Sequence, residues 1–307
     1  MRIISLISSA TEIVSSLGCS EFLVGISHEC DYPNNIKDLP VCSEPKFDVE
    51  VSSIEVDSQV KSLLQDALSI YRVKEHKISE LEPDLIITQS QCSVCAVSLD
   101  DVQNALKKNL DISPLVISLE PNNLNDVLMD IQNLGTKLKK TDAANNIVNI
   151  FNKEIDYLKK TNQNQNKITI ACVEWIDPLM FAGNWVPEIV DIAGGNDLFG
   201  LKGEHSSWSK YSELYQKNPD KIVFMPCGYN IEKTSIEIKN LYKMKEWMDL
   251  EAVKLGNIYI ADGSQYFNRP GPRLLDSIKI MNDIIHDTDL HGFFGKGWVK
   301  IDKNSLS

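Results

Sequence analysis

Short apolar runs alternate with longer amphipathic stretches along most of the 307 residues. An apolar run bounded by turn-forming residues is typical of a buried strand, whereas apolar positions spaced by three and four are typical of a helix. The alternation predicts an α/β fold with parallel sheets flanked by helices. The predicted strands are Ile3–Ile7, Phe22–Ile26, Leu85–Thr88, Leu115–Ser118, Ile168–Val173, Ile222–Met225 and Ile258–Ala261. The clearest predicted helices are Thr11–Leu17, Val60–Leu68, Leu124–Leu138 and Leu274–Ile285.

One local pattern occurs twice. A Pro-Asp pair stands between a helix end and an apolar strand in Leu81–Ile87, and again in Lys217–Phe224. A glycine-marked turn with a short strand lies ahead of each, at Gly18–Gly25 and at Gly195–Gly200. The recurrence indicates two related lobes. The alternative to two related lobes is that Pro-Asp is simply a common turn before a buried strand in α/β proteins.

A long helix is predicted between the two halves, beginning near Thr141 as its cap. Apolar residues continue along one face of it to Lys160. A single helix is a stiff connector, so we expect opening of the lobes to be small. The predicted division is 1–140 for the first lobe, 141–163 for the connecting helix, 164–288 for the second lobe and 289–307 for a tail.

The charge balance narrows the classes of ligand. Lys and Arg total 31 against 43 Asp and Glu, a formal net charge of −12, which argues against a surface for nucleic acid. The only arginines are Arg2, Arg72, Arg269 and Arg273, so the residue best suited to carboxylates and phosphates is scarce. An anionic ligand is therefore disfavoured.

The opening segment predicts a strand running into a helix rather than a signal peptide, because Glu12 interrupts its short apolar stretch. The cysteine count of seven is odd, without the spacing of a disulfide framework, and this favours reduced thiols. From both features we expect a cytoplasmic protein. An extracytoplasmic location is the expectation if a leader has been removed.

Ligands of open parallel sheets collect in the loops at the carboxyl ends of the strands. Here those loops contain neutral polar residues together with Trp175, Trp185 and Trp208. Large rings supply contact area while amides and hydroxyls set orientation, which suits a broad, mostly uncharged ligand. The alternative for any one tryptophan is that it closes the core beneath a long loop. Ser9 and Glu12 are spaced as a capping box that would fix the first helix at the same edge.

Cys92 and Cys95 form a Cys-x-x-Cys pair, which alone is half of a metal site or a redox pair. A zinc or iron site would need further ligands such as His28 or His205. The alternative is that these are reduced thiols packed under the site. Motifs of serine hydrolases, nucleotide-binding loops and zinc proteases do not occur in the sequence.

Two groups of segments in the first half carry a family resemblance: Arg2–Leu6 with Ser9–Glu12, and Val24–Ser27 followed by Asp31-Tyr32-Pro33. The resemblance continues through Leu81–Ile87, Ala193–Phe199 and Asn218–Val223, and it covers roughly residues 1–288. In these segments the chain resembles the class III substrate-binding proteins of ABC importers, most closely their cobalamin-binding branch.

The resemblance implies two Rossmann-like lobes joined by one long helix, with cobalamin or a related corrinoid held in the cleft between them. It implies a carrier for uptake or trafficking rather than an enzyme, with an ABC transporter permease as its partner. The expected ligand contacts are Ser9, His28, Tyr32, Gln91, Trp175, Phe181, Asn184, Trp185, His205, Trp208, Tyr229, Tyr266, Phe267, Asn268 and Arg269.

Two alternatives stay open beside this interpretation. One is a metal- or thiol-dependent protein that uses Cys92, Cys95, His28 and His205. The other is a siderophore or haem carrier on the same fold, for which Arg269 is the main candidate anion contact. His28 or His205 is also a candidate to approach the cobalt of a corrinoid, although a corrinoid can keep its own base.

Overall fold

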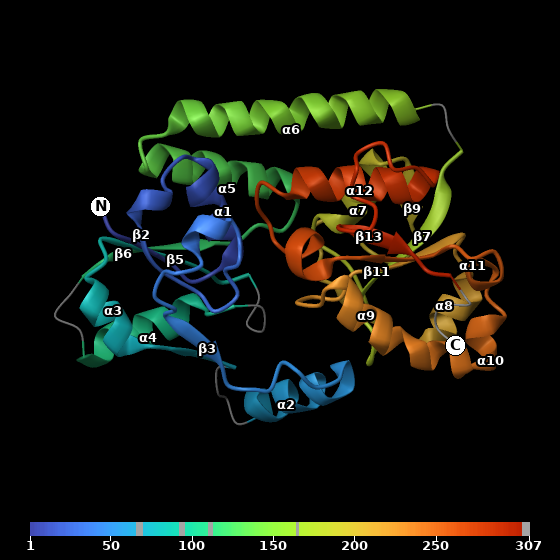
Figure 1. Cartoon of the computed structure of the whole chain (residues 1–307), viewed down its shortest axis with the longest axis horizontal. Coiled ribbons are helices and arrows are strands. Elements are labelled where there is room, and N and C mark those ends of the chain that lie inside the picture. Colours follow the sequence, from blue (N-terminus) through green and yellow to red (C-terminus); the bar gives the residue numbers. More distant parts are fainter. Residues whose placement is uncertain (66–69, 92–95, 110–112, 164–165, 303–307) are drawn as a thin grey trace. The chain divides into compact units, whose positions relative to one another are not determined.

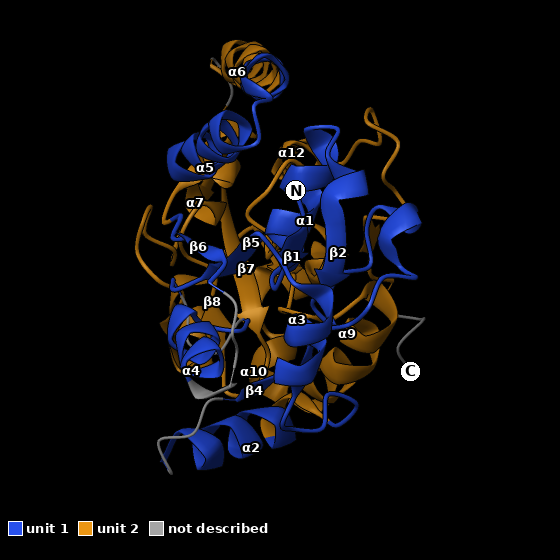
Figure 2. Cartoon of the chain, turned by 90° about the vertical axis from the view of Figure 1, so that its left-hand side faces the viewer, with its two compact units in different colours: residues 1–51, 55–121, 125–148 blue, residues 52–54, 122–124, 149–307 orange. Residues whose placement is uncertain are grey.

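The computed structural model describes residues 1–65, 70–91, 96–109, 113–163 and 166–302. The chain divides into two compact units (Figure 2). Unit 1 comprises 1–51, 55–121 and 125–148, and unit 2 comprises 52–54, 122–124 and 149–307. None of the described helices is both long and apolar enough to cross a lipid bilayer. The predicted α/β class is confirmed.

Unit 1 is built on a four-stranded parallel sheet in the order β2-β1-β5-β6. Helices α1 and α5 lie on one side of this sheet and α3 and α4 on the other (Figures 1 and 2). Its main elements are β1 (Ile3–Ser5), α1 (Ser8–Ser16), β2 (Leu23–Ile26), α2 (Ser53–Gln65), α3 (Glu75–Leu81), β5 (Leu85–Gln89), α4 (Leu99–Asn109), β6 (Leu115–Leu119) and α5 (Leu124–Lys137). Two 3-10 turns at Ser20–Phe22 and Asn34–Ile36 and an antiparallel pair of β3 (Ser43–Pro45) and β4 (Tyr71–Val73) complete the unit.

Unit 2 contains a larger sheet with strand order β10-β8-β7-β11-β12-β13, and β9 also pairs with β7. Its strands are β7 (Ile168–Trp175), β8 (Met180–Phe181), β9 (Gly195–Asp197), β10 (Ser207–Trp208), β11 (Lys221–Phe224), β12 (Ile258–Ala261) and β13 (Trp298–Lys300). Its helices are α7 (Val186–Ile192), α8 (Tyr211–Lys217), α9 (Ile231–Glu237), α10 (Lys245–Met248), α11 (Glu251–Lys254) and α12 (Leu274–His286), with a 3-10 turn at Ile238–Lys243 and a π-helical turn at Gly263–Phe267.

The central strands of both sheets are apolar on both faces, as strands covered by helices on both sides must be. In β7 the side chains alternate, so that Ala171 and Val173 enter one hydrophobic cluster while Ile170 and Cys172 are buried on the opposite face. Leu214 of α8 and Trp247 of α10 belong to the first cluster. Each of the seven predicted strands overlaps an observed strand, because an apolar run of this length is a direct signal of a doubly covered strand.

The two units share a strand order. The parallel strands of unit 1 run β2-β1-β5-β6, and those of unit 2 run β9-β7-β11-β12 in the corresponding sequence order. The two Pro-Asp pairs occupy equivalent places: α3 ends at a left-handed Glu82 and α8 at a left-handed Asn218, with φ of 40° and 43°. The inference of two related halves from the repeated pattern agrees with this topology.

The aspartates of the two Pro-Asp pairs also perform the same task. Asp84 precedes β5, and its Oδ2 accepts a hydrogen bond of 2.7 Å from the backbone N–H of Arg2, at the start of neighbouring β1. Asp220 precedes β11, and its Oδ2 accepts from the backbone N–H and hydroxyl of Thr169 at 2.7 Å, at the start of neighbouring β7. Each carboxylate therefore fastens the amino ends of two adjacent parallel strands.

The predicted connecting helix is α6 (Thr141–Asn162), a helix of 22 residues. Thr141 is its first helical residue, so the expected role of this side chain as the cap before the helix is wrong by one position. The division between the units falls after Val148, within this helix. Its first turn carries Asp142 and its last turn Lys159 and Lys160, an arrangement that complements the helix dipole.

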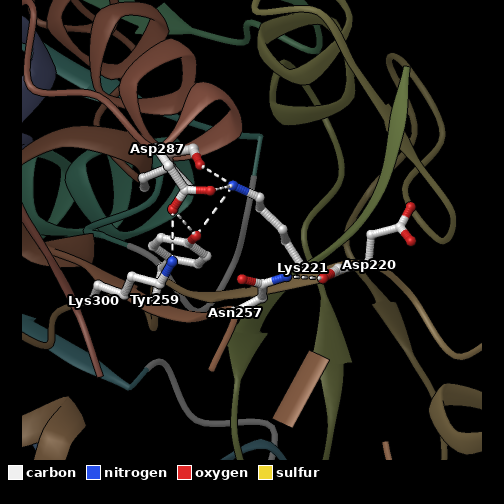
Figure 3. A network of polar contacts seen from close by, with 7 residues as sticks. Asp220, Lys221, Asn257, Tyr259, Asp287 and Lys300 are labelled. Atoms are coloured by element: carbon white, nitrogen blue, oxygen red, sulfur yellow. Dashed lines mark hydrogen bonds and ion pairs between the residues drawn. The ribbon is translucent and has the colours of Figure 1, made fainter. Parts of the chain in front are cut away.

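A polar network lies at the amino ends of β11 and β12 (Figure 3). The Lys221 ammonium donates to Asp287 Oδ2 at 2.6 Å, to Tyr259 Oη at 3.1 Å and to the backbone carbonyl of Ile284 at 2.8 Å. Lys300 donates to the other oxygen of Asp287 at 2.7 Å. The network ties the end of α12 to the sheet at the edge opposite to the one where a ligand is expected, so its role is structural.

The segment expected to be a tail joins the unit 2 sheet. Strand β13 pairs antiparallel with β12, with Tyr259 opposite Lys300 and Ala261 opposite Trp298. Phe293 packs edge-on against Tyr266, with ring centroids 5.8 Å apart. The described part of this segment is therefore integral to unit 2.

Candidate functional site

In unit 1, the loops that follow β1 and β2 are joined at the carboxyl edge of the sheet. The hydroxyl of Ser8 donates to the carbonyl of Glu29 at 3.4 Å, and Thr11 Oγ1 lies 3.1 Å from Cys30 Sγ. Thr11 also donates to Ser5 Oγ at 2.8 Å. These contacts fix the start of α1 against the loop that carries His28.

The expected capping box at Ser9 and Glu12 is wrong. Ile7 occupies the N-cap position of α1 without a side-chain hydrogen bond, so Ser9 already lies within the first turn. Both side chains are buried instead, and Ser9 Oγ has no hydrogen-bond partner. A buried hydroxyl without a partner is costly in free energy, which keeps Ser9 a candidate contact for a polar ligand atom.

His28 is held rigidly just beyond β2. Its Nδ1 lies 2.9 Å from Ser43 Oγ, and its ring packs on Tyr71 with centroids 5.4 Å apart. Burial, reinforced by the positive charge of Lys74, lowers the pKa of His28 to about 4, against an opposing effect of Glu44. The imidazole is therefore neutral near pH 7. Ser43 and Tyr71, on β3 and β4, were not anticipated, because these short strands carry no apolar run.

Of the other candidates in unit 1, Tyr32 is 46% exposed and Gln91 is half-buried. Cys92 and Cys95 lie outside the described residues. No group of three or more His, Cys, Asp or Glu side chains is arranged to hold a metal ion in the part of the chain that the structure describes. Cys19, Cys42 and Cys172 are fully buried core residues.

In unit 2, three loops meet at the carboxyl ends of β7, β11 and β12. The amide of Cys227 donates to the carbonyl of Glu174 at 3.2 Å, and the amide of Ser264 donates to the carbonyl of Tyr229 at 3.1 Å. Asn268 donates from Nδ2 to the carbonyls of Met225 and Gly263, both at 2.9 Å. The side-chain amide of Asn268 thus holds two loops together, which assigns it a structural task beside any contact with a ligand.

Trp175 and Tyr229 form an aromatic pair at this edge, with ring centroids 5.3 Å apart. Trp175 Nε1 and Tyr229 Oη are both buried and have no hydrogen-bond partner. Burial without a partner costs about 1–3 kcal/mol for each such group. Two adjacent rings at this edge therefore carry polar tips without a protein partner, although Tyr229 is only 4% exposed and Trp175 is half-buried.

Asn184 lies on a second pair of loops, where residues 182–185 are bound to residues 203–206. Its backbone N–H donates to the carbonyl of Glu204 at 2.6 Å, and its carbonyl accepts from Gly203 at 2.9 Å. Gly183 is required beside it, because a Cβ there would come within 2.4 Å of the Glu204 carbonyl. The Oδ1 atom of Asn184 is buried and unpaired, as are the polar tips of Trp175 and Tyr229.

Glu174 adds an ionisable group that the sequence argument did not select as a site residue. Its Oε2 accepts a hydrogen bond of 2.9 Å from Ser206, whose hydroxyl also accepts from the amide of Gly183 at 3.1 Å. Burial raises the pKa of Glu174 to about 7, although the Ser206 hydrogen bond acts in the opposite direction. Its position immediately before Trp175, at the end of a predicted strand, was the available signal.

Three of the aromatic candidates face the interior, which corrects the expectation that they contact a ligand. Phe181 is 1% exposed and stacks on Phe199 at 3.7 Å between ring centroids. Phe267 is fully buried, and its carbonyl accepts the indole N–H of the buried Trp185 at 2.8 Å. These side chains offer a ligand almost no surface, and they instead support the alternative that aromatic residues close the core.

The remaining candidates of unit 2 differ in exposure. His205 is exposed and Trp208 is 58% exposed, whereas Tyr266 is half-buried. Arg269 is buried, and the equally buried Arg273 lies over the ring of Tyr266, 5.5 Å from its centroid. The arginines at this edge are therefore committed to the interior of unit 2, and Arg269 is poorly placed as the main anion contact.

A family model of periplasmic binding proteins matches residues 3–264. The vitamin B12-binding protein of Vibrio campbellii is 22% identical over 281 residues, which cover 90% of this chain and 86% of that protein. Among solved structures, the periplasmic vitamin B12-binding protein BtuF of Vibrio cholerae has a TM-score of 0.67 at 17% identity, covering 94% of this chain and 98% of its own.

The haem complex of IsdE from Staphylococcus aureus matches equally well, with a TM-score of 0.69 at 17% identity and coverage of 93% and 98%. At these identities the structural matches show the fold alone, whereas the family model spans well over half of the chain. The resemblance to class III substrate-binding proteins of ABC importers is confirmed: the chain belongs to the periplasmic binding protein family.

Proposed function

We propose that this chain is a carrier of cobalamin or a related corrinoid. The observation that carries the proposal is the Trp175–Tyr229 ring pair at the carboxyl edge of the unit 2 sheet, together with unpaired neutral polar atoms in the loops of that unit. Trp175 Nε1, Asn184 Oδ1 and Tyr229 Oη include two donors and an acceptor. A corrinoid presents a broad macrocycle with an amide rim, which needs apolar contact area and both kinds of hydrogen bond.

The charge at this edge favours a neutral ligand over an anionic one. Glu174 and Asp262 are acidic residues of the edge, and Arg269 and Arg273 are buried within unit 2. Carboxylates of haem or of many ferric siderophores are best held by accessible arginine or lysine groups. Lys233 is one such cation, and its ammonium lies 4.1 Å from the centre of the Tyr229 ring.

The relatives support a role in delivery to an ABC transporter permease. The named vitamin B12-binding proteins support the corrinoid, and the periplasmic description of the Vibrio cholerae protein favours a location outside the cytoplasmic membrane. The haem-bound neighbour makes haem the second candidate function. The two candidate functions are distinguished by measuring the binding of both ligand classes to the same purified protein.

The test is equilibrium dialysis of the protein against cyanocobalamin, haemin and a ferric siderophore. We expect saturable binding of cyanocobalamin at one equivalent, and much weaker binding of the two anionic ligands. Saturable binding of haemin or of the siderophore in preference to cyanocobalamin would overturn the proposal.

The variant Tyr229→Phe tests whether the unpaired Tyr229 hydroxyl forms a hydrogen bond with the ligand. Loss of one hydrogen bond is worth about 0.5–1.5 kcal/mol, so we expect affinity for cyanocobalamin to fall by roughly two- to tenfold. Tyr242→Phe is the matched control, because Tyr242 packs against Trp247 in a hydrophobic cluster of unit 2. Equal affinities of the two variants would assign the Tyr229 hydroxyl no part in binding.

A further inference from the structure

A β-bulge places Glu174 at the carboxyl edge of the unit 2 sheet. In the antiparallel pairing of β7 with β8, Val173 lies opposite Phe181. Trp175, two residues further along β7, lies opposite Met180, which is only one residue further along β8. Glu174 is therefore the extra residue of the bulge. A bulge of this kind redirects a side chain, and such bulges are frequent beside functional sites.

The protein fixes one oxygen of the Glu174 carboxylate and leaves the other available. Oε2 accepts a hydrogen bond of 2.9 Å from Ser206, whose hydroxyl accepts one of 3.1 Å from the amide of Gly183. Oε1 has no hydrogen bond with any described residue, and unlike the unpaired atoms of Trp175 and Tyr229 it is not fully buried. The carboxylate is thus oriented through one oxygen, while the other is accessible to a ligand.

No cation balances the Glu174 carboxylate among the described residues. Burial raises its pKa to about 7, and the Ser206 hydrogen bond is the one interaction that lowers this pKa. A carboxylate that is desolvated without an ion-pair partner costs free energy of folding. Its presence at the carboxyl edge of the sheet therefore indicates a task other than stabilising the fold.

Asp262, another acidic residue of this edge, is engaged differently. Its Oδ1 accepts from the backbone amide of Gln265 at 2.9 Å, and its Oδ2 accepts from the side-chain amide of Gln265 at 3.2 Å. Asp262 thereby caps the π-helical turn at Gly263–Phe267. Of these two acidic residues, Glu174 is the one with an oxygen that no described residue binds.

An ionised carboxylate at this position can distinguish an amide from a carboxylate. The N–H of a primary amide donates to the charged oxygen, and such a charge-assisted hydrogen bond is about twice as strong as a neutral one. A ligand carboxylate has no hydrogen to donate, and it would place two negative charges side by side in a partly desolvated site. The ring faces of Trp175 and Tyr229 offer contact area to either kind of macrocycle, so they do not make this distinction.

We propose that Oε1 of Glu174 accepts a hydrogen bond from a peripheral amide of the bound corrinoid, and that it thereby rejects macrocycles with a carboxylate in that place. The inference rests on the proposed function and names a residue of unit 2 that sets the choice between neutral and anionic ligands.

The test compares two ligands by equilibrium dialysis at pH 8.5, where Glu174 is ionised because the pH exceeds its pKa of about 7. The ligands are cobinamide, a corrinoid with an amide rim, and cobyrinic acid, the corresponding macrocycle with carboxylates in place of the amides. Cyanocobalamin is the reference for binding as such. Each ligand is measured with wild type, Glu174→Gln and the control Glu251→Gln.

The two substitutions remove the same charge at different places. Glu174→Gln keeps an acceptor for Ser206, and thermal melting confirms that each variant is folded. Glu251 is exposed, and it lies at the opposite edge of the sheet, since its backbone amide donates to Asn218 Oδ1 shortly before β11. The control therefore measures how much the loss of one negative charge changes binding without contact with the ligand.

We expect wild type to prefer cobinamide over cobyrinic acid, and Glu174→Gln to reduce this preference by about ten- to a hundredfold. Glu251→Gln should change it by less than about threefold, because solvent and salt screen an exposed charge.

No preference in the wild type, or equal preferences in wild type and Glu174→Gln, would overturn the role of Glu174 alone. Equal reductions in the two variants would do the same. Binding of cyanocobalamin without binding of cobinamide would also overturn it, since the amide rim would then not be what the protein recognises. Absence of cyanocobalamin from the dialysed wild type would overturn the proposed function and this inference together.

Discussion

Glu174 shows how one buried carboxyl at the candidate site links stability to pH. Burial raises its pKa from 4.5 to about 7 in the folded chain. Between these values the unfolded chain loses this proton while the folded chain keeps it, so the folded state binds more protons. The contribution of Glu174 therefore makes the protein less stable as pH rises from 4.5 to 7, and it is constant above that range.

The variant Glu174→Gln removes this titration and keeps an acceptor for Ser206. We expect the free energy of unfolding of the variant, relative to wild type, to rise by on the order of 2 kcal/mol between pH 4.5 and pH 7. Urea unfolding at a series of pH values measures it. Asp130, whose pKa burial also raises to about 7, is present in both proteins and cancels in the difference. A difference independent of pH would contradict the assignment of this proton to Glu174.

At the residue scale, the sequence could not show which aromatic side chains are exposed to a ligand. Phe181 and Trp208 are both aromatic residues on short segments of unit 2, but one is 1% and the other 58% exposed. Strands β8 and β10 have two residues each, too few for alternation to reveal which side chain faces inward. Aromatic identity alone could therefore not separate ligand contacts from core residues.

At the scale of elements, the paired aspartates before β5 and β11 explain why the Pro-Asp pattern occurs twice. Proline sets an extended backbone after the left-handed end of a helix, and the following carboxylate accepts amide hydrogens of the adjacent strand. The turn could be predicted from the sequence because proline and aspartate act on the local backbone. The hydrogen-bond partners of the two aspartates, Arg2 and Thr169, could not be predicted, since they lie 82 and 51 residues away in sequence.

The substitutions Asp84→Ala and Asp220→Ala test this role. Each removes charge-assisted hydrogen bonds to a strand end, so we expect each to lower the free energy of unfolding by about 1–3 kcal/mol. Because Asp220 accepts two such bonds and Asp84 accepts one from a backbone amide, we expect Asp220→Ala to lower the free energy of unfolding more than Asp84→Ala does. Asp156→Ala is the control, because Asp156 is exposed on α6 and has no hydrogen bond in the described structure. Equal, small effects at all three positions in urea unfolding would refute the role.

Strands without an apolar run were not predicted from the sequence. Strand β3 is Ser-Glu-Pro, and β4 carries Arg72 at its centre, so neither shows the signal by which the seven strands were found. Their pairing brings Ser43 and Tyr71 to His28. The contacts that fix the His28 ring thus result from the pairing of β3 with β4, and no local pattern around residue 28 could have indicated them.

At the scale of the whole molecule, the sequence predicted two related α/β halves, and the repeated strand order agrees with that prediction. The β2-β1-β5-β6 and β9-β7-β11-β12 orders follow from two similar successions of strand, helix and Pro-Asp turn. Ligand identity is a property of a few side chains, and relatives of the same fold include vitamin B12-binding and haem-bound proteins. The shared fold therefore does not decide the ligand, which depends on the side chains that contact it.

The central claim is that the carboxyl edge of the unit 2 sheet selects a neutral, amide-rimmed macrocycle. Its most direct test is the ligand that the protein carries when purified from its own host, grown in medium that contains cobalamin, haem and iron. Visible spectroscopy and mass spectrometry of the extracted ligand identify it. We predict a red protein that releases a corrinoid in near-stoichiometric amount. Release of haem or a ferric siderophore, with no corrinoid above background, would contradict the account.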